Sequence, residues 1–312
     1  MQRVHTPVMV AEVLECLEPA SGKVYLDGTL GTGGHAGAIL ERSAPAGRVI
    51  GFDADPESLE IARKRLAPYG SRIFFVHARY EQASQILAEL GVPRVQGALL
   101  DLGFSRVQLE APGRGFSFEA EGPLDMRMDR TTGRTAAQVL ESLSEAEMAR
   151  LFKELGEERW SRRIARGIER RRRKDGSPQT TRELVQVILR SLPGRGRPAR
   201  IHPATRVFQA LRITVNRELE ALKKFLDDLP ELLPGGGRFC VISFHSLEDR
   251  LVKERFQRWE QGCRCSAAPG LCACPREPLF RRMHRKVVRP RPQEVAANPQ
   301  SRSARLRAVE RL

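Results

Sequence analysis

The stretch Asp27-Gly28-Thr29-Leu30-Gly31-Thr32-Gly33-Gly34-His35 decides how the first part of the chain folds. It follows a short apolar run, Lys23–Leu26, and its glycines allow a tight turn in which the backbone can approach a ligand closely. A helix that starts after such a turn offers free N–H groups to a cofactor. Because residues 31–36 fit the pattern G-x-G-x-x-A, a dinucleotide is one candidate ligand. A purely structural glycine turn is the other interpretation.

Short apolar runs and helical patterns alternate around this turn. The apolar runs, each typical of a buried strand, are Lys23–Leu26, Arg48–Phe52, Arg72–Val76 and Gly97–Leu100. The clearest helical patterns between them are Pro56–Leu66 and Glu81–Leu90. Such an alternation predicts a parallel β-sheet that is covered by helices on both faces.

The alternation stops after Asp101. Residues 109–123 are rich in Gly, Pro and Phe and predict a loop, and three helical stretches follow without a strand between them. Capping boxes begin the first stretch at Ser144 and the third at Thr180, and Gly156 is expected to end the first. We therefore expect an α/β fold in which residues 1–108 and 206–312 form one domain and residues 109–205 form an inserted all-helical domain.

The α/β pattern resumes after the insertion. Pro203 suits a helix start because its φ is fixed and it lacks an N–H donor, and the helix is expected to run to about Leu226. A strand is expected at Arg238–Phe244. The tail holds two more expected strands, Arg285–Val288 and Ala304–Val309, which could pair as a terminal hairpin.

Three carboxylates end predicted strands. Asp27 follows the first strand, Asp53 ends the second and Asp101 ends the fourth, near the cleft that opens at the carboxyl ends of parallel strands. Asp53 is placed to bind the two hydroxyls of a ribose, and Asp27 to offset an ammonium group. Three carboxylates would repel the phosphates of a dinucleotide but suit the positive sulfur and amino-acid tail of S-adenosylmethionine. The residues therefore favour S-adenosylmethionine, and helix N-caps are the alternative use of these acids.

Composition narrows the class of partner. The chain has 312 residues and a formal net charge of +15, and a clustered excess of this kind predicts a nucleic acid as partner. A well-solvated cationic surface is the alternative. No run reaches the roughly 20 apolar residues of a membrane helix, and the acidic N-terminal segment does not resemble a signal peptide. We therefore expect a cytoplasmic protein without a membrane partner.

Four of the six cysteines gather in one short segment. They are Cys263, Cys265, Cys272 and Cys274. Four thiolates in one loop could hold zinc in a tetrahedral site, although the one-residue spacing within each pair is tighter than the usual two to four. Free thiols or an oxidised pair are the alternatives. Cys16 and Cys240 stand alone in apolar patterns and are expected to be buried free thiols.

Runs of sequence spread over nearly the whole chain match one known family. In chain order they are His5–Val8, Asp27–His35, Asp101–Gly103, Arg114–Phe118, Gly122–Asp129, Gly156–Arg159, His202–Ile213, Asn216–Leu219, Ile242–Arg250 and Asn298–Leu312. On these residues the chain resembles the bacterial 16S ribosomal RNA cytosine-N4 methyltransferase family. The run Gly122–Asp129 is highly specific to it.

The resemblance implies a Rossmann-like class I methyltransferase domain with a helical insertion. It implies transfer of a methyl group from S-adenosylmethionine to the exocyclic N4 amine of one cytidine in 16S rRNA of the small ribosomal subunit. Position by position, the implied donor contacts are Gly33, Gly34, His35, Asp53, Asp101 and Gln108. Tyr80 stands where the family usually has Phe, so its ring is expected to stack on adenine.

Catalysis requires a partner for the amine. A cytosine amine is a poor nucleophile because its lone pair is delocalised, and a nearby carboxylate would orient it and stabilise the charge that develops on nitrogen. Asp101 is the first candidate, although the Pro-Pro-aromatic element of many amine methyltransferases is reduced here to Phe104. Asn216 and His245 are further candidates. For His245 a buried histidine or a helix cap is the alternative, and a cap-like role is expected for His202.

Basic residues crowd one predicted helix of the insertion. They are Arg159, Arg162, Arg163, Arg166 and Arg170–Lys174. Because some lie at helical spacings and therefore share a face, they are expected to contact the RNA backbone. A solvated helix face is the alternative, and a second basic patch spans residues 276–291.

Two other functions stay open on the sequence. One is a DNA amine methyltransferase, which the missing prolines disfavour. The other is a donor-binding RNA assembly factor without turnover.

Overall fold

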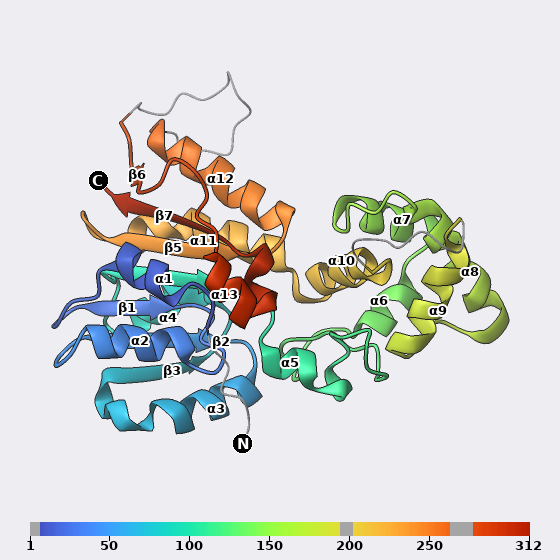
Figure 1. Ribbon diagram of the computed structural model, residues 1–312, viewed down its shortest axis with the longest axis horizontal. Coiled ribbons are helices and arrows are strands. Elements are labelled where there is room, and N and C mark those ends of the chain that lie inside the picture. The colour runs from blue at the N-terminus through green and yellow to red at the C-terminus, as the bar shows by residue number, and fades with distance from the viewer. Residues whose placement is uncertain (1–6, 194–201, 263–276) are drawn as a thin grey trace. The chain divides into compact units, whose positions relative to one another are not determined.

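The chain divides into two compact units, each with its own core. The structure is a computed structural model that describes residues 7–193, 202–262 and 277–312 (Figure 1). The first unit comprises residues 1–103 and 219–312, and the second residues 104–218. The second unit thus begins before residue 109 and ends after residue 205, the bounds expected for the insertion.

The first unit is built on a twisted, mostly parallel sheet. Among the described residues the sheet has seven strands, in the order β3-β2-β1-β4-β5-β7-β6 (Figure 1). The strands are β1 Val24–Asp27, β2 Arg48–Asp53, β3 Ile73–His77, β4 Gly97–Asp101, β5 Arg238–Ser243, β6 Phe280–Arg282 and β7 Arg305–Arg311. Strands β1 to β5 pair in parallel, whereas β7 is antiparallel to both β5 and β6.

Helices cover both faces of this sheet, as the alternation of strands and helices predicts. They are α1 Val10–Leu17, α2 Gly34–Arg42, α3 Pro56–Leu66, α4 Ala83–Glu89, α11 Glu218–Leu232, α12 Ser246–Glu260 and α13 Pro292–Ala297, with short 3-10 turns η1 Ala67–Arg72, η2 Tyr80–Gln82 and η4 Pro299–Ser303. Successive strand side chains point to opposite faces. Leu26 and Leu100 therefore join the core formed with α4, α11 and α12, while Tyr25 and Leu99 join the core formed with α1, α2 and α3.

The second unit consists of helices and loops in its described part. Its helices are α5 Arg106–Glu110, α6 Ala136–Ser142, α7 Glu145–Glu154, α8 Ser161–Asp175, α9 Thr181–Ser191 and α10 Ala204–Asn216, and η3 Pro112–Arg114 is a 3-10 turn. One hydrophobic cluster contains residues of all five helices α6, α7, α8, α9 and α10. Its fully buried members include Phe152, Ile164, Ile188 and Leu211. The prediction of an all-helical insertion is confirmed.

The single helix expected from Ala204 to about Leu226 is wrong. Arg217 has a φ of 49°, in the left-handed region, and ends α10 before α11 begins. The apolar face of α10, including Val207 and Leu211, packs in the core of the second unit, whereas Leu222 and Phe225 of α11 pack under the sheet. This break is why the second unit extends to residue 218.

The expected tail strand at Arg285–Val288 is also wrong. On the edge side, β7 pairs with β6, which lies earlier in the tail, and Val288 makes only an isolated bridge to Leu306. Pro290 and Pro292 follow that bridge, and proline cannot donate to a strand ladder.

Cys16 and Cys240 are buried free thiols of one core cluster, as expected. The four clustered cysteines, Cys263, Cys265, Cys272 and Cys274, lie outside the described residues, so the zinc hypothesis stays a prediction. Within the described ranges, none of the helices has the length and apolar character that crossing a membrane requires.

Gly156 has a different role from the one expected. Helix α7 ends at Glu154, and the residue with left-handed φ is Glu157. A Cβ on Gly156 would lie 2.5 Å from the carbonyl oxygen of Arg206 and 2.7 Å from that of Phe152. The glycine therefore allows the backbone of α10 to approach the end of α7.

Gly156→Ala should destabilise the second unit by about 1–3 kcal/mol, because backbone atoms have no rotamer by which to yield. Gly113→Ala is the matched control, since a Cβ there meets nothing within 4 Å. Urea unfolding followed by circular dichroism measures both. Equal unfolding midpoints for the two variants would contradict this role of Gly156.

Candidate active site

The turn after β1 requires glycine at two positions. Gly33 is the N-cap of α2 with a φ of 80°, and a Cβ there would lie 2.8 Å from Cδ1 of Leu66. A Cβ on Gly34 would lie 2.9 Å from Cγ of Pro7. No side chain caps α2, so the first N–H groups of this helix are available to a ligand.

Three carboxylates lie together at the carboxyl edge of the sheet. Asp27, Asp53 and Asp101 are the last residues of β1, β2 and β4, which are adjacent in the sheet. Thr29 links two of these strand ends: its N–H donates to Oδ1 of Asp27 over 3.2 Å, and its Oγ1 accepts from the N–H of Asp101 over 2.6 Å. The glycine turn and the acids thus form one local structure.

Asp27, His35 and Asp101 form a polar cluster that we call the buried acid–histidine cluster. Asp27 is 1% exposed and His35 is 6% exposed. Nε2 of His35 lies 3.3 Å from Oδ2 of Asp101, at ion-pair distance but without hydrogen-bond alignment. Among the described residues, Oδ2 of Asp27, Oδ1 of Asp101 and both ring nitrogens of His35 have no hydrogen-bond partner.

Leaving a buried polar atom unpaired costs about 1–3 kcal/mol. Several such atoms in one place are therefore unfavourable unless a ligand supplies their partners. Carboxylate oxygens require a donor, and an ammonium group or a hydroxyl would serve. These residues fit the amino-acid end of S-adenosylmethionine, because that end carries an ammonium group.

The pKa of Asp27 is raised to about 7, mainly by burial. His35 and the Thr29 N–H oppose the shift, and the nearby Asp101 and Asp53 add to it. Burial lowers the pKa of His35, but the Asp101 and Asp27 carboxylates outweigh this effect and raise it overall. Asp27 and His35 thus hold their protons more tightly than free side chains do. A cation placed beside Asp27 would favour its charged form.

Asp53 organises the start of the neighbouring loop. Its Oδ2 accepts from the N–H of Gly31 over 2.6 Å, and its Oδ1 accepts from the N–H of Asp55 over 2.8 Å. Burial raises its pKa to about 6, although both backbone hydrogen bonds oppose the shift. Each carboxylate oxygen has a second lone pair. Asp53 can therefore accept two further hydrogen bonds, one on each oxygen.

Tyr80 and Gln108 lie in different units. Tyr80 begins η2 and packs edge-on against Phe225, with 5.7 Å between ring centroids. Gln108 lies buried in α5 of the second unit, where its Oε1 accepts from the N–H of Ser105 over 2.9 Å in a capping box. The structure thus gathers Gly33, Gly34, His35, Asp53, Tyr80 and Asp101 in the first unit. The donor contact of Gln108 stays a prediction.

The candidate catalytic residues have three different surroundings. Asp101 belongs to the buried acid–histidine cluster. His245 is the N-cap of α12: its Nδ1 accepts from the N–H of Glu248 over 3.4 Å, and its Nε2 lies 3.1 Å from Oε1 of the same residue. The helix-cap interpretation of His245 is confirmed, and a catalytic role for it stays a prediction. His202 also caps, since its Nδ1 accepts from the N–H of Ala204 over 3.2 Å.

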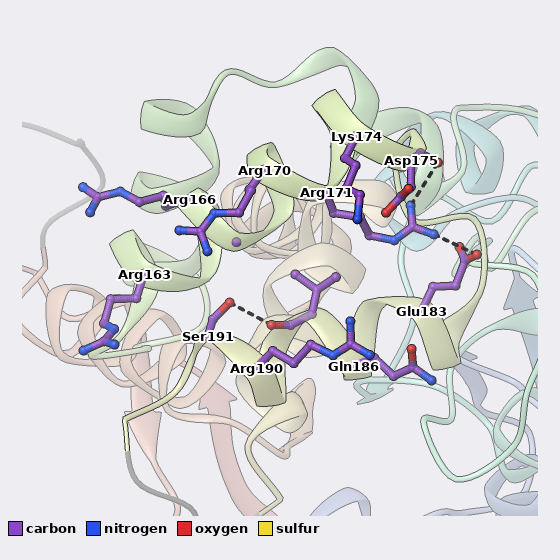
Figure 2. Close-up of a pocket in the computed structure, with 12 residues that line it drawn as sticks. Arg163, Arg166, Arg170, Arg171, Lys174, Asp175, Glu183, Gln186, Arg190 and Ser191 are labelled. Atoms are coloured by element: carbon purple, nitrogen blue, oxygen red, sulfur yellow. Dashed lines mark hydrogen bonds and ion pairs between the residues drawn. The ribbon is translucent and has the colours of Figure 1, made fainter.

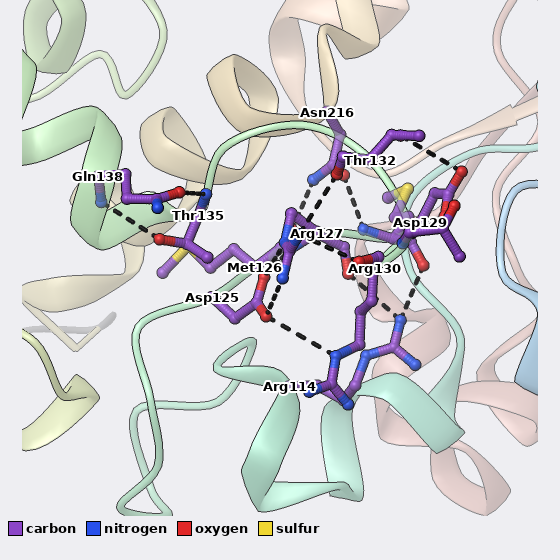
Figure 3. A network of polar contacts seen from close by, with 12 residues as sticks. Arg114, Asp125, Met126, Arg127, Asp129, Arg130, Thr132, Thr135, Gln138 and Asn216 are labelled. Atoms are coloured by element: carbon purple, nitrogen blue, oxygen red, sulfur yellow. Dashed lines mark hydrogen bonds and ion pairs between the residues drawn. The ribbon is translucent and has the colours of Figure 1, made fainter.

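Asn216 holds a loop of the second unit (Figure 3). Its Oδ1 accepts from the N–H of Met128 over 2.8 Å, and its Nδ2 donates to the carbonyl oxygens of Met126, over 2.8 Å, and Arg212, over 3.0 Å. Both amide hydrogens are therefore engaged by backbone. This arrangement makes Asn216 a positioning residue, and direct participation in catalysis stays a prediction.

The loop that Asn216 holds carries residues to which the sequence analysis gave no role. Met126 is buried with a φ of 64°, a strained conformation for a residue with a side chain. Arg127 binds the carboxylate of Asp125 through two hydrogen bonds of 2.7 and 3.0 Å, and buried Arg114 donates to the carbonyls of residues 127 and 128 (Figure 3). The sequence signal that could have predicted this network is the high content of Asp and Arg in residues 122–130.

Parallel strands β1 to β5, an antiparallel β7, and glycines and acids at the carboxyl edge define a Rossmann-like methyltransferase. The model of the MraW methylase family matches residues 2–312, so the chain belongs to that family. It is therefore an S-adenosylmethionine-dependent methyltransferase. The relatives that it matches include named proteins from several bacteria.

Ribosomal RNA small subunit methyltransferase H of Syntrophotalea carbinolica is 52% identical over 308 residues, which cover 99% of this chain and 98% of the relative. The protein of the same name from Geobacter sp. strain M21 is 51% identical over 309 residues, with 99% and 98% covered. A solved S-adenosylmethionine-dependent O-methyltransferase from Thermotoga maritima has a TM-score of 0.41 and 11% identity, covering 100% of this chain and 68% of its own.

Asp27→Asn should make the donor-free protein more stable at pH 8 but not at pH 4. Folding raises the pKa of Asp27 to about 7. The contribution of protonated Asp27 to the free energy of unfolding is therefore complete below the unfolded pKa and is lost as the pH rises through 7. Asparagine has no such loss and keeps the acceptor for the Thr29 N–H. At about 1.4 kcal/mol per pKa unit, the rise from the ordinary value of 3.8 to about 7 corresponds to a gain of about 4 kcal/mol at pH 8.

Urea unfolding across this pH range measures the gain. Glu60→Gln is the control, because it removes one carboxylate that is 62% exposed. A stability difference between Asp27→Asn and the wild type that stays constant from pH 4 to pH 8 would show that Asp27 is not strained by burial.

Proposed function

We propose that this protein methylates the exocyclic N4 amine of a cytidine in 16S rRNA of the small ribosomal subunit. The observation that carries the donor half of the proposal is the buried acid–histidine cluster with its unpaired polar atoms beside the glycine turn. The RNA substrate is supported by relatives that are 52% and 51% identical over 99% of this chain and whose names specify small-subunit ribosomal RNA. The formal net charge of +15 suits a polyanionic substrate.

The donor is proposed to lie along the carboxyl edge of the sheet. Gly33, Gly34 and His35 would contact the methionine part at the start of α2, and Asp27 would face its ammonium group. The two oxygens of Asp53 would accept the two ribose hydroxyls through their remaining lone pairs. The ring of Tyr80 would pack on the adenine, and its edge-on contact with Phe225 would hold that ring in place.

S-adenosylmethionine supplies a methyl group on a positive sulfur. Asp101 is proposed to act on the acceptor: its Oδ1 has no hydrogen-bond partner among the described residues, so it can accept from the cytosine amine. His35 lies beside the other carboxylate oxygen and keeps the side chain of Asp101 oriented. An oriented amine with a carboxylate at its developing positive charge is the arrangement that the reaction needs.

Methyl transfer from labelled S-adenosylmethionine tests this function. Undermethylated small ribosomal subunits, free 16S rRNA and duplex DNA are incubated with the wild-type protein, and the modified nucleoside is identified by mass spectrometry. We expect label on N4 of a single cytidine in the ribosomal substrate. Label on duplex DNA alone would favour a DNA amine methyltransferase, and donor binding without transfer to any substrate would favour an assembly factor.

Asp53→Asn should weaken binding of S-adenosylmethionine by about 10- to 100-fold, the value of hydrogen bonds to a charged group. The amide keeps one acceptor oxygen but turns its NH₂ toward a backbone N–H. Glu60→Gln on the exposed side of α3 removes the same charge and should leave the affinity unchanged. Calorimetric titration measures both, and equal affinities for the two variants would refute the ribose role of Asp53.

A further inference from the structure

A groove between α8 and α9 of the second unit is lined by basic side chains. It has a volume of about 580 Å³. Arg163, Arg166, Arg170, Arg171 and Lys174 line it from α8, and Arg190 lines it from α9 (Figure 2). Glu183 and Asp175 are the carboxylates among its lining residues, so the six cations exceed the acids by four.

The floor of the groove depends on a close approach of the two helices. Gly167 lies in the middle of α8, where a Cβ would fall 2.0 Å from Oγ of Ser191. That hydroxyl is in turn held by the carbonyl oxygen of Val187, to which it donates over 2.7 Å. A glycine inside a helix costs about 1 kcal/mol relative to alanine, so its presence here has a packing reason.

The basic side chains of α8 divide into tethered and available ones. Arg171 pairs with Glu183 over 2.8 Å, and Arg173, which lies outside the groove, pairs with Glu169 over 2.8 Å. Arg172 also contacts Glu169. Among the described residues, no carboxylate forms an ion pair with Arg170, Lys174 or Arg190, and all three are exposed.

The chemistry of the lining indicates an anionic ligand. Sites for small organic molecules are mostly apolar, whereas the lining here is dominated by guanidinium groups and an ammonium group. Guanidinium groups bind phosphate oxygens in a bidentate manner. The basic side chains extend from Arg163 to Lys174, which at 1.5 Å per residue is about 16 Å of helix, more than one phosphate group occupies.

We propose that the α8–α9 groove binds successive backbone phosphates of the RNA substrate, with Arg170, Lys174 and Arg190 as the main contacts. The proposal rests on the proposed function and adds to it the residues that hold the RNA strand. Such contacts fix the position of the strand and do not read its sequence. The arginine run of α8 is visible in the sequence, but the contribution of Arg190 becomes apparent only when α9 lies beside α8.

The test compares two triple variants that lose the same charge from the same two helices. The groove variant is Arg170→Gln, Lys174→Gln and Arg190→Gln. The control variant is Arg162→Gln, Arg173→Gln and Arg182→Gln, none of which lines the groove. Binding of unmethylated small-subunit rRNA to the full chain is measured over a range of salt concentrations, and calorimetry measures the affinity for S-adenosylmethionine.

Each lost phosphate contact should reduce the slope of log K against log salt by about 0.7, the value for single strands. The groove variant should therefore show a slope shallower by about 2 and an affinity about 100-fold lower near 0.1 M salt. The control variant should stay close to the wild type. Restoring charge with Arg170→Lys and Arg190→Lys, with Lys174 intact, should recover most of the slope.

Equal losses of RNA affinity and salt slope in the two triple variants would overturn the groove proposal, because net charge alone would then explain the binding. A second outcome would also overturn the proposal: the wild type binds inorganic pyrophosphate, and the groove variant loses this binding while its salt slope for RNA is unchanged. The groove would then be a site for a small anion. The binding measurement is independent of turnover. If the wild type methylates the RNA but the groove variant loses no more RNA affinity than the control variant, the groove proposal alone is refuted. If the groove variant selectively loses RNA affinity but the wild type does not methylate the RNA, the proposed reaction alone is refuted.

Discussion

The carboxyl ends of adjacent parallel strands place three carboxylates side by side at one edge of the sheet, and this crowding dominates the proposed donor site. Burial raises the pKa of Asp27 to about 7, with repulsion from Asp101 and Asp53 adding to the shift, and burial raises that of Asp53 to about 6. His35 relieves part of the repulsion, since its ring lies beside Asp101. The remaining unpaired oxygens make the donor-free site costly, and a cationic, hydroxyl-bearing ligand would remove that cost. The same arrangement that destabilises the empty edge would therefore provide the selectivity of the proposed donor site.

The second unit depends on a different constraint, the left-handed break at Arg217. It separates α10 from α11 and lets each helix bury its apolar face in a different core. Asn216, the last residue of α10, then holds the loop around Met126 in a conformation that a residue with a side chain avoids. The unit thus has a rigid loop at one place and, between α8 and α9, a basic groove at another.

Much of the first unit could be predicted from local sequence. The apolar runs ending at Asp27, Asp53 and Asp101 fixed β1, β2 and β4, and the pattern of Pro56–Leu66 matched α3 residue for residue. The predicted bounds were wrong where contacts with residues distant in the sequence determine the secondary structure. The first tail strand was expected at Arg285–Val288, whereas it lies at Phe280–Arg282 as β6, and one long helix was expected where Arg217 divides two. No periodicity marks such a break, because both flanking segments are helical and apolar on one face.

By itself the sequence indicated the class of the protein: the strand-ending acids and the glycine turn favoured S-adenosylmethionine, and motifs over nearly the whole chain resembled one methyltransferase family. It also determined that a helical insertion carries much of the basic charge. Only the tertiary structure decided which atoms are buried without partners, because burial is a property of packing between distant segments. It likewise decided that Asn216 holds a loop 88 residues away in the chain. It also decided that Arg190 lines the same groove as the arginines of α8, because the packing of helices brings together residues that are distant in the sequence.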